Sequence, residues 1–176
     1  MSCSKSHPVY DFAWAACLYQ PPLSGLICRF KYNQKTSLRK FLSRLMIDFI
    51  KTYSLDVMQF DKIVPIPLFH SRLRERGYNQ SQFLAEEIAN EYKIDLSLSN
   101  LARVRETQHQ TLLSEKERWT NIRGAFRIKH PAESSGKNIL IVDDLLTTGA
   151  TASEAARALK DAGAKTVGVL TLAIAE

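Results

Sequence analysis

Apolar residues along the chain follow two spacings, which predict strands and helices in alternation. Small and aromatic residues dominate positions 9–19 and predict a strand, which is closed by Pro21 and Pro22. Apolar residues then recur every three or four positions over 23–30 and over 38–50, the spacing of amphipathic helices. The N-terminal third is therefore expected to form one strand followed by two helices.

The rest of the chain continues this alternation. Short apolar runs predict strands at 62–66, 126–129, 139–142 and 167–174. Helices are expected over 79–92, after Ser114 and after Thr151, whereas the polar stretch that starts at Leu101 shows neither period and predicts a long loop. Strands separated by helices indicate an α/β fold, in which ligands bind at the carboxyl ends of the strands.

The stretch 139–162 carries the clearest candidate chemistry. An apolar run leads into Asp143 and Asp144, and then into a loop of small and hydroxyl residues: Thr147, Thr148, Gly149, Ala150 and Thr151. Thr151 and Glu154 have the spacing of a capping box, so we expect a helix to begin there. Amides at a helix N-terminus bind phosphate monoesters, and carboxylates accept hydrogen bonds from a ribose diol. The stretch therefore predicts a ribose 5-phosphate site.

Other interpretations of paired aspartates after a strand compete with this one. A Walker-B strand requires an upstream GxxxxGK[ST] loop, and the sequence contains none. A receiver domain needs roughly a hundred further residues, and only 32 follow Asp144. An ordinary strand–loop–helix unit with solvated aspartates stays open, although strand, acids, loop and helix together favour a site.

A second unit places cations after the strand at 62–66. Four basic residues lie within seven positions there: His70, Arg72, Arg74 and Arg76. Arginine forks match phosphate oxygens, and a pyrophosphate needs several cations or a metal, so we interpret this segment as a loop that contacts pyrophosphate. A solvated charge run ahead of a helix is the alternative.

The segment VDDLLTTGAT resembles the phosphoribosyl pyrophosphate (PRPP) signature of the type I phosphoribosyltransferases. The segment PIPLFHSRLRERGYNQ resembles the signature of the competence protein F (ComF) family, which is linked to natural DNA uptake and to use of DNA as a nutrient. The run RxRxTxxQ from Arg103 to Gln110 is similar to ComF proteins as well. Together these similarities extend from about Val9 to the end of the sequence.

The resemblance implies a role for each candidate residue. Asp143 and Asp144 would hold the ribose hydroxyls, with Mg²⁺ arriving on PRPP nearby rather than through direct protein ligands. The 5-phosphate would be wrapped by Thr147, Thr148, Gly149, Ala150 and Thr151. The pyrophosphate would face Arg72, Arg74 and Arg76. The run from Arg103 to Gln110 would take the place of the segment that closes over PRPP in active transferases. Arg103 and Arg105 would close onto phosphate, and Thr107, Gln108 and Gln110 would offer polar contacts. Arg72 and Arg105 are the candidate catalytic residues, because cations stabilise a leaving pyrophosphate.

The resemblance also implies a fold. We expect one domain over 1–176, a three-layer α/β structure with a mostly parallel central sheet, divided into a small hood over 1–58 and a PRPP-binding core over 59–176. ComF proteins usually carry an N-terminal zinc module of paired cysteines, and this sequence is expected to lack it. Cys3, Cys17 and Cys28 form no CxxC pair and are expected to be reduced thiols.

Composition agrees with a globular protein. The chain has 176 residues, of which 45% are hydrophobic, and no apolar run reaches membrane-spanning length. No signal peptide is evident, so a cytoplasmic location is expected. The formal net charge of +6 arises in the first two-thirds of the sequence, which fits an anionic ligand or nucleic acid.

Three functions remain open at this stage. The first is a PRPP-binding ComF-family protein that works with other DNA-uptake proteins in natural transformation or in use of DNA as a nutrient. The second is an active phosphoribosyltransferase in nucleotide salvage. The third is a single-stranded DNA binding module, in which basic segments alternate with Phe69, Tyr78 and Trp119 as stacking residues.

Overall fold

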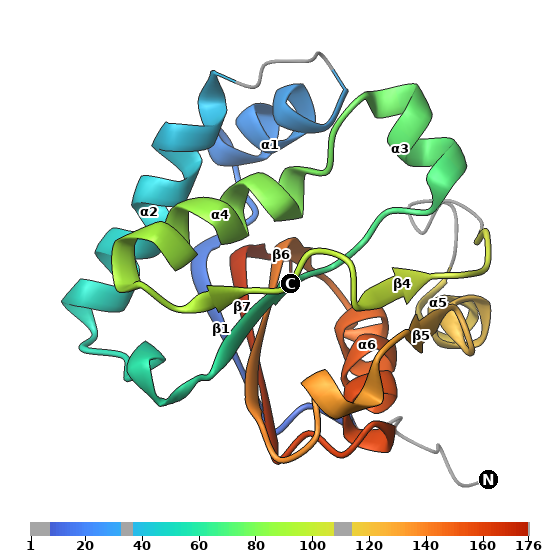
Figure 1. The fold of residues 1–176 in the computed structure, drawn as a ribbon. Helices are drawn as coiled ribbons and strands as arrows, with labels where there is room; N and C mark the ends of the chain where they lie inside the picture. Colours follow the sequence, from blue (N-terminus) through green and yellow to red (C-terminus); the bar gives the residue numbers. More distant parts are fainter. Residues whose placement is uncertain (1–7, 33–36, 108–113, 176) are drawn as a thin grey trace, which may run out of the picture.

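The computed structural model describes residues 8–32, 37–107 and 114–175, and the core of the described part is a five-stranded parallel sheet (Figure 1). The strand order is β1 (Phe12–Leu18), β7 (Thr166–Ile174), β6 (Asn138–Leu146), β2 (Lys62–Pro65) and β3 (Asp95–Leu96). The inner strands are buried on both faces, which explains their unbroken apolar runs. The predicted α/β class with a parallel central sheet is confirmed.

Helices cover both faces of the sheet. One face packs against α1 (Leu23–Tyr32), α2 (Leu38–Thr52) and α4 (Gln80–Tyr92), and the other packs against α6 (Ala150–Asp161) and α5 (Glu115–Ile122) (Figure 1). The alternation within β6 divides the two cores: Leu140 and Val142 face α2 and α4, whereas Ile139 and Ile141 face α6. This gives the three layers.

The N-terminal segment is built into the sheet. β1 pairs in parallel with β7 at one edge, with Phe12 opposite Gly168. Phe12 and Trp14 then pack with Phe60, their ring centroids 4.8 to 6.3 Å apart. The segment that we expected to form a hood therefore supplies an edge strand and two helices to the main body.

Two expectations for the loops are wrong. The basic segment predicted as a loop is a helix, α3 (His70–Arg76), which ends at Gly77 with a left-handed φ of 80°. The segment from Leu101 begins with a short strand, β4 (Leu101–Arg103), which pairs antiparallel with β5 (Phe126–Ile128) beside the main sheet. Two 3₁₀ turns, Val57–Gln59 and Pro131–Glu133, complete the described elements.

Helix α5 begins where the sequence predicts. Both halves of a capping box are present: the Ser114 backbone N–H donates to Glu117 Oε2 at 2.8 Å, and the Glu117 backbone N–H donates to the Ser114 side chain. Cys17 and Cys28 are free thiols, and Cys3 lies outside the described residues. No helix in the described part of the chain is long and apolar enough to cross a membrane.

Candidate functional site

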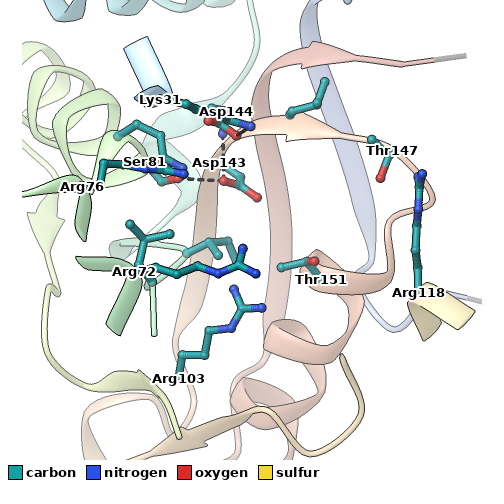
Figure 2. Close-up of a pocket in the computed structure, with 14 residues that line it drawn as sticks. Lys31, Arg72, Arg76, Ser81, Arg103, Arg118, Asp143, Asp144, Thr147 and Thr151 are labelled. Atoms are coloured by element: carbon teal, nitrogen blue, oxygen red, sulfur yellow. Dashed lines mark hydrogen bonds and ion pairs between the residues drawn. The ribbon is translucent and has the colours of Figure 1, made fainter. Parts of the chain in front are cut away.

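A cavity of about 180 Å³ opens at the carboxyl ends of β2 and β6. Its walls come from α1, from the consecutive helices α3 and α4, from α5, and from β6 with the first turn of α6, together with Arg103 of β4 (Figure 2). Parallel strands place their carboxyl ends at one edge of the sheet, so the loops and helices that follow them meet there. The cavity lies where the sequence predicts a ligand.

Asp143 is a half-buried carboxyl held in a fixed orientation. Its Oδ1 accepts hydrogen bonds from the Ser81 hydroxyl at 2.7 Å and from the Asp144 backbone N–H at 2.9 Å. Among the described residues, none donates a hydrogen bond to Oδ2. Burial, and then repulsion from Asp144, raise the pKa of Asp143 to about 7. The carboxyl is therefore divided between its neutral and ionised forms near neutral pH.

Asp144 is held by a cation from the N-terminal segment. Lys31, in the last turn of α1, places Nζ 3.0 Å from Asp144 Oδ1, and the Asp144 side chain is only 4% exposed. Burial lowers the pKa of Lys31, but attraction to Asp144 and Asp143 outweighs burial, so the net pKa of Lys31 is raised. Asp144 Oδ2 is buried without a partner among the described residues. The second aspartate is therefore a partly satisfied acceptor in a buried ion pair.

Residues 147–151, which we name the phosphate loop, lead from the end of β6 into the first turn of α6. Gly149 is the N-cap of α6 and has a φ of 77°. The Thr148 hydroxyl accepts from the Ala150 N–H at 3.4 Å, while Thr147 and Thr151 line the cavity. This loop brings the positive end of the α6 dipole to the same cavity as the aspartates.

The predicted capping box at Thr151 is wrong. Thr151 lies inside the first turn of α6, because the helix begins one residue earlier at Ala150. Glu154 instead accepts a hydrogen bond from the Gly124 N–H at 2.8 Å and joins α6 to the end of α5. The carboxylate therefore connects two elements rather than capping one.

The N-terminal segment also covers the phosphate loop. A Cβ on Gly149 would lie 2.8 Å from the Tyr10 hydroxyl, so the ring of Tyr10 packs directly on this glycine. The Val9 N–H donates to the Ser153 hydroxyl at 3.0 Å, one turn into α6. A side chain at position 149 would therefore displace the Tyr10 hydroxyl.

Arginines form the opposite wall of the cavity. Arg72 and Arg76 come from α3 and Arg103 from β4, and the guanidinium groups of Arg72 and Arg103 converge (Figure 2). Arg72 Nη2 donates to the Thr107 carbonyl at 3.0 Å, and Arg76 donates to the Gln80 side chain. Burial, and then repulsion from Arg72, lower the pKa of Arg103 to about 10.

The structure brings some predicted residues together and leaves others apart. Arg72, Arg76, Asp143, Asp144, Thr147 and Thr151 line one cavity. Arg74 is exposed and is not part of its wall. Arg105 lies away from the cavity, since its guanidinium donates to the carbonyls of Asn121 and Arg123, both at 2.6 Å. Gln108 and Gln110, which we expected to offer polar contacts, lie outside the described residues.

Four polar wall residues had no assigned role in the sequence: Lys31, Gln80, Ser81 and Arg118. Arg118 belongs to α5 and lies beside Thr147 (Figure 2). Lys31 is a basic residue at the end of an amphipathic helix, and nothing in that pattern indicates a contact more than a hundred residues along the chain. For Arg118 the sequence offered only a weak signal, a basic residue in a short charged helix.

Comparison with known proteins agrees with this geometry. A family model described as "Phosphoribosyl transferase domain" matches residues 75–175, which include α4, Arg103, both aspartates and the phosphate loop, but not Lys31 or Arg72. The class of the fold is therefore that of the phosphoribosyltransferases.

Relatives that match most of this chain define the family within the phosphoribosyltransferase class. Competence protein F of Haemophilus influenzae is 33% identical over 178 residues, which cover 98% of this chain and 76% of that protein. DNA utilization protein YhgH of Escherichia coli K12 is 33% identical over 172 residues, 97% of this chain and 75% of that protein. Competence protein ComFC of Bacillus subtilis is 33% identical over 149 residues, 82% of this chain and 56% of that protein. The chain belongs to the competence protein F family.

Proposed function

We propose that the cavity binds PRPP and that the protein acts in DNA uptake or in use of DNA as a nutrient. The role in DNA handling is supported by the names of its relatives, which are competence and DNA utilization proteins. The choice of ligand is supported by the chemistry of the cavity, which offers separate groups for a phosphate, a diol and a pyrophosphate.

One observation carries the proposal: three sets of groups that a phosphoribosyl ligand needs face the same cavity. Thr147 and Thr151 stand at the positive end of α6 and suit the 5-phosphate. Asp143 offers a free carboxyl oxygen for the ribose hydroxyls. Arg72 and Arg103 suit the pyrophosphate, since guanidinium forks match phosphate oxygens.

Magnesium fits this arrangement through the ligand. Asp143 lines the cavity, its Oδ2 lacks a hydrogen-bond donor among the described residues, and carboxylate oxygens suit a hydrated magnesium ion. We propose that Mg²⁺ arrives on PRPP and lies near Asp143 and Asp144. When bound, the ion would offset the negative charge of the pyrophosphate.

Phosphoribosyl transfer is the second candidate function. It is favoured by Arg72 and Arg103, which line the cavity and could stabilise a leaving pyrophosphate. In such a transfer a nitrogen nucleophile forms a bond to ribose C1 as the bond from C1 to pyrophosphate breaks. Little acid or base catalysis is needed, because positioning and charge stabilisation of the leaving group lower the barrier. Release of pyrophosphate from PRPP, measured with a panel of bases and amines, tests this activity.

Single-stranded DNA stacking receives less support from the described residues. The Tyr78 ring stacks on Phe83 at 5.4 Å and its hydroxyl donates to the Phe30 carbonyl, so the ring is packed within the protein. Trp119 is half-buried and packs against the core on the α6 side. Both aromatic residues therefore already have partners in the fold.

Calorimetric titration with PRPP and Mg²⁺ tests the proposed ligand. Wild-type protein is expected to bind, and Asp143→Asn is expected to weaken binding by roughly 10- to 100-fold, the effect of losing a charged hydrogen-bond acceptor. Asp161→Asn, an exposed change at the opposite end of α6, is the control and should bind like the wild type. No binding to the wild type, or equal binding to Asp143→Asn, would overturn the proposal.

A cellular experiment tests the role in DNA handling. Cells that lack the protein are expected to transform poorly or to grow poorly on DNA as a nutrient. The wild-type protein and Asp161→Asn should restore the phenotype, whereas Asp143→Asn should not. Full restoration by Asp143→Asn would separate the cellular role from PRPP.

A further inference from the structure

Thr107 contacts two cavity arginines from two different atoms. Its carbonyl oxygen accepts a hydrogen bond from Arg72 Nη2 at 3.0 Å, and its hydroxyl oxygen accepts one from Arg103 Nη2. Arg72 belongs to α3 and Arg103 to β4, so Thr107 is where these two elements meet beside the cavity. The residue is 6% exposed, one of ten buried polar or charged residues in the part of the chain that the structure describes.

The two arginines are held together against their own repulsion. The lowered pKa of Arg103 has burial as its first cause and the charge of Arg72 as its second. Arg103 lies with Cζ 5.6 Å from the centre of the Phe126 ring, and its Nε is buried without a partner among the described residues. A buried donor without an acceptor, beside a second guanidinium, indicates a place prepared for an anion.

A further contact joins the same two segments. The Ser71 hydroxyl donates to Glu106 Oε1 at 2.6 Å, next to the Arg72–Thr107 contact. Helix α3 and the segment that follows β4 are therefore connected by side-chain and backbone contacts at consecutive positions. The spacing of Arg72 and Arg103 depends on this junction, with Thr107 at its buried end.

We propose that Thr107 is a positioning residue that holds Arg72 and Arg103 as a paired clamp for a pyrophosphate group. This role rests on the proposed function, because the clamp would receive the pyrophosphate half of PRPP. Two guanidinium groups at one place match two linked phosphoryl groups, each of which can accept a forked pair of hydrogen bonds. A single phosphate monoester would use only one side of the clamp.

The test uses one ligand for each end of the cavity: ribose 5-phosphate for the phosphate loop, and pyrophosphate for Arg72 and Arg103. Ribose 5-phosphate is titrated alone, and inorganic pyrophosphate is titrated into protein whose phosphate loop is filled with saturating ribose 5-phosphate. Thr107→Val removes the hydroxyl but keeps the backbone carbonyl that Arg72 uses. It is expected to weaken pyrophosphate binding roughly tenfold, the effect of losing one charged hydrogen bond, and to change ribose 5-phosphate binding less than twofold.

Thr107→Ser keeps the hydroxyl and is expected to bind pyrophosphate like the wild type. Thr52→Val, an exposed change at the end of α2, is the matched control. Should Thr107→Val fail to fold in a melting experiment, Arg103→Lys replaces it, because lysine keeps the charge but lacks the fork; the same selective loss of pyrophosphate binding is expected.

The positioning role is overturned if Thr107→Val binds pyrophosphate like the wild type, or if it loses both ligands equally, as a purely structural role predicts. Equal losses in Thr107→Ser and Thr107→Val would also contradict it. In each of these cases wild-type binding of PRPP would still stand, so the proposed function would survive. If the wild type bound neither ribose 5-phosphate nor pyrophosphate, the proposed function and this role would both be overturned.

Discussion

At the scale of single residues, the raised pKa of Asp143 makes ligand binding depend on pH. A ribose diol donates hydrogen bonds and binds an ionised carboxylate more strongly than a neutral carboxyl group, and a pKa of about 7 leaves Asp143 mostly neutral at pH 6. The ionised fraction rises roughly tenfold between pH 6 and pH 8 for such a pKa. We therefore expect PRPP affinity to rise by about that factor over this interval, measured by calorimetry at constant ionic strength.

The raised pKa of Asp143 also determines how the stability of the protein changes with pH. Because the pKa of Asp143 is higher in the folded than in the unfolded protein, the folded state holds more protons between about pH 4 and pH 7. This contribution to the free energy of unfolding is fully present below the unfolded pKa and is lost as pH rises through 7. Asp143→Asn should lack both pH effects, and an unchanged affinity profile in that variant would show that the ligand phosphates alone titrate.

Lys31 is expected to stabilise the fold as well as the site. Lys31→Met leaves the Asp144 carboxylate buried without its cation, and breaking a buried ion pair costs up to about 3–5 kcal/mol. Lys31 is 19% exposed, so solvent reduces this cost, and we expect a loss of about 1–3 kcal/mol in urea unfolding. The double variant Lys31→Met, Asp144→Asn should recover part of the loss.

Lys40→Met is the matched control, because Lys40 lies on the exposed face of α2. A lysine that contributed only surface charge would give equal, small effects at positions 31 and 40. That result would contradict a structural ion pair at Asp144.

The residues that the sequence did not predict share a physical reason. Asp143, Asp144 and the phosphate loop are contiguous, so local pattern and spacing identify them without tertiary information. Lys31 and Arg118 reach the cavity from α1 and α5, and their positions depend on how those helices pack on the sheet. Arg105 shows the converse: its place in a basic motif suggested the cavity, but carbonyls at the end of α5 hold it elsewhere.

At the scale of elements, Gly149 is the point where the phosphate loop and α6 meet. Its φ of 77° is unfavourable for alanine, and an alanine Cβ would lie 2.8 Å from the Tyr10 hydroxyl. Gly149→Ala is expected to cost about 1 kcal/mol in stability and to weaken ribose 5-phosphate binding several-fold, because the amides of the loop shift. Urea unfolding and calorimetry measure the two effects.

Gly163→Ala provides the control for backbone strain. Gly163 follows the opposite end of α6 and has a φ of 90°. It should lose a similar amount of stability without any change in affinity. Equal losses of affinity in both variants would show that the phosphate loop is not itself the binding element.

Helix α3 shows why element type was harder to predict than element position. Its charged residues show no apolar stripe, because the helix buries none of its residues, and so periodicity gave no helical signal. Arginine and glutamate are nonetheless good helix formers, and Gly77 provides a left-handed end. The basic charges were therefore predicted at the right edge of the sheet but on the wrong kind of element.

At the scale of the whole molecule, the buried apolar strands made the fold predictable from sequence, whereas the place of the N-terminal segment was not. Runs such as 139–142 and 167–174 are buried on both faces and are typical of a parallel sheet. The edge position of β1 depends instead on packing with residues over 150 positions away, such as Phe12 opposite Gly168. The spacing of apolar residues within 8–58 does not indicate that β1 pairs with β7.

Gly168 tests how far this packing holds the molecule together. An added Cβ would lie 2.8 Å from the Phe60 ring and 2.9 Å from the Phe12 ring, inside the aromatic cluster that joins β1 to the core. Gly168→Ala is therefore expected to lower the free energy of unfolding by about 1–3 kcal/mol, the usual cost of overpacking, while PRPP affinity stays unchanged because Gly168 does not line the cavity.

The same substitution at Gly25 should have the opposite sign. Gly25 lies within α1, and nothing stands within 4 Å of its added Cβ, so Gly25→Ala is expected to raise stability by about 0.4–1 kcal/mol. If Gly168→Ala were as stable as the wild type, the aromatic cluster would be loosely packed and β1 only weakly coupled to the sheet. Because Lys31 reaches the cavity from the segment that β1 anchors, PRPP affinity would then depend on conditions that detach this segment, such as low urea concentrations.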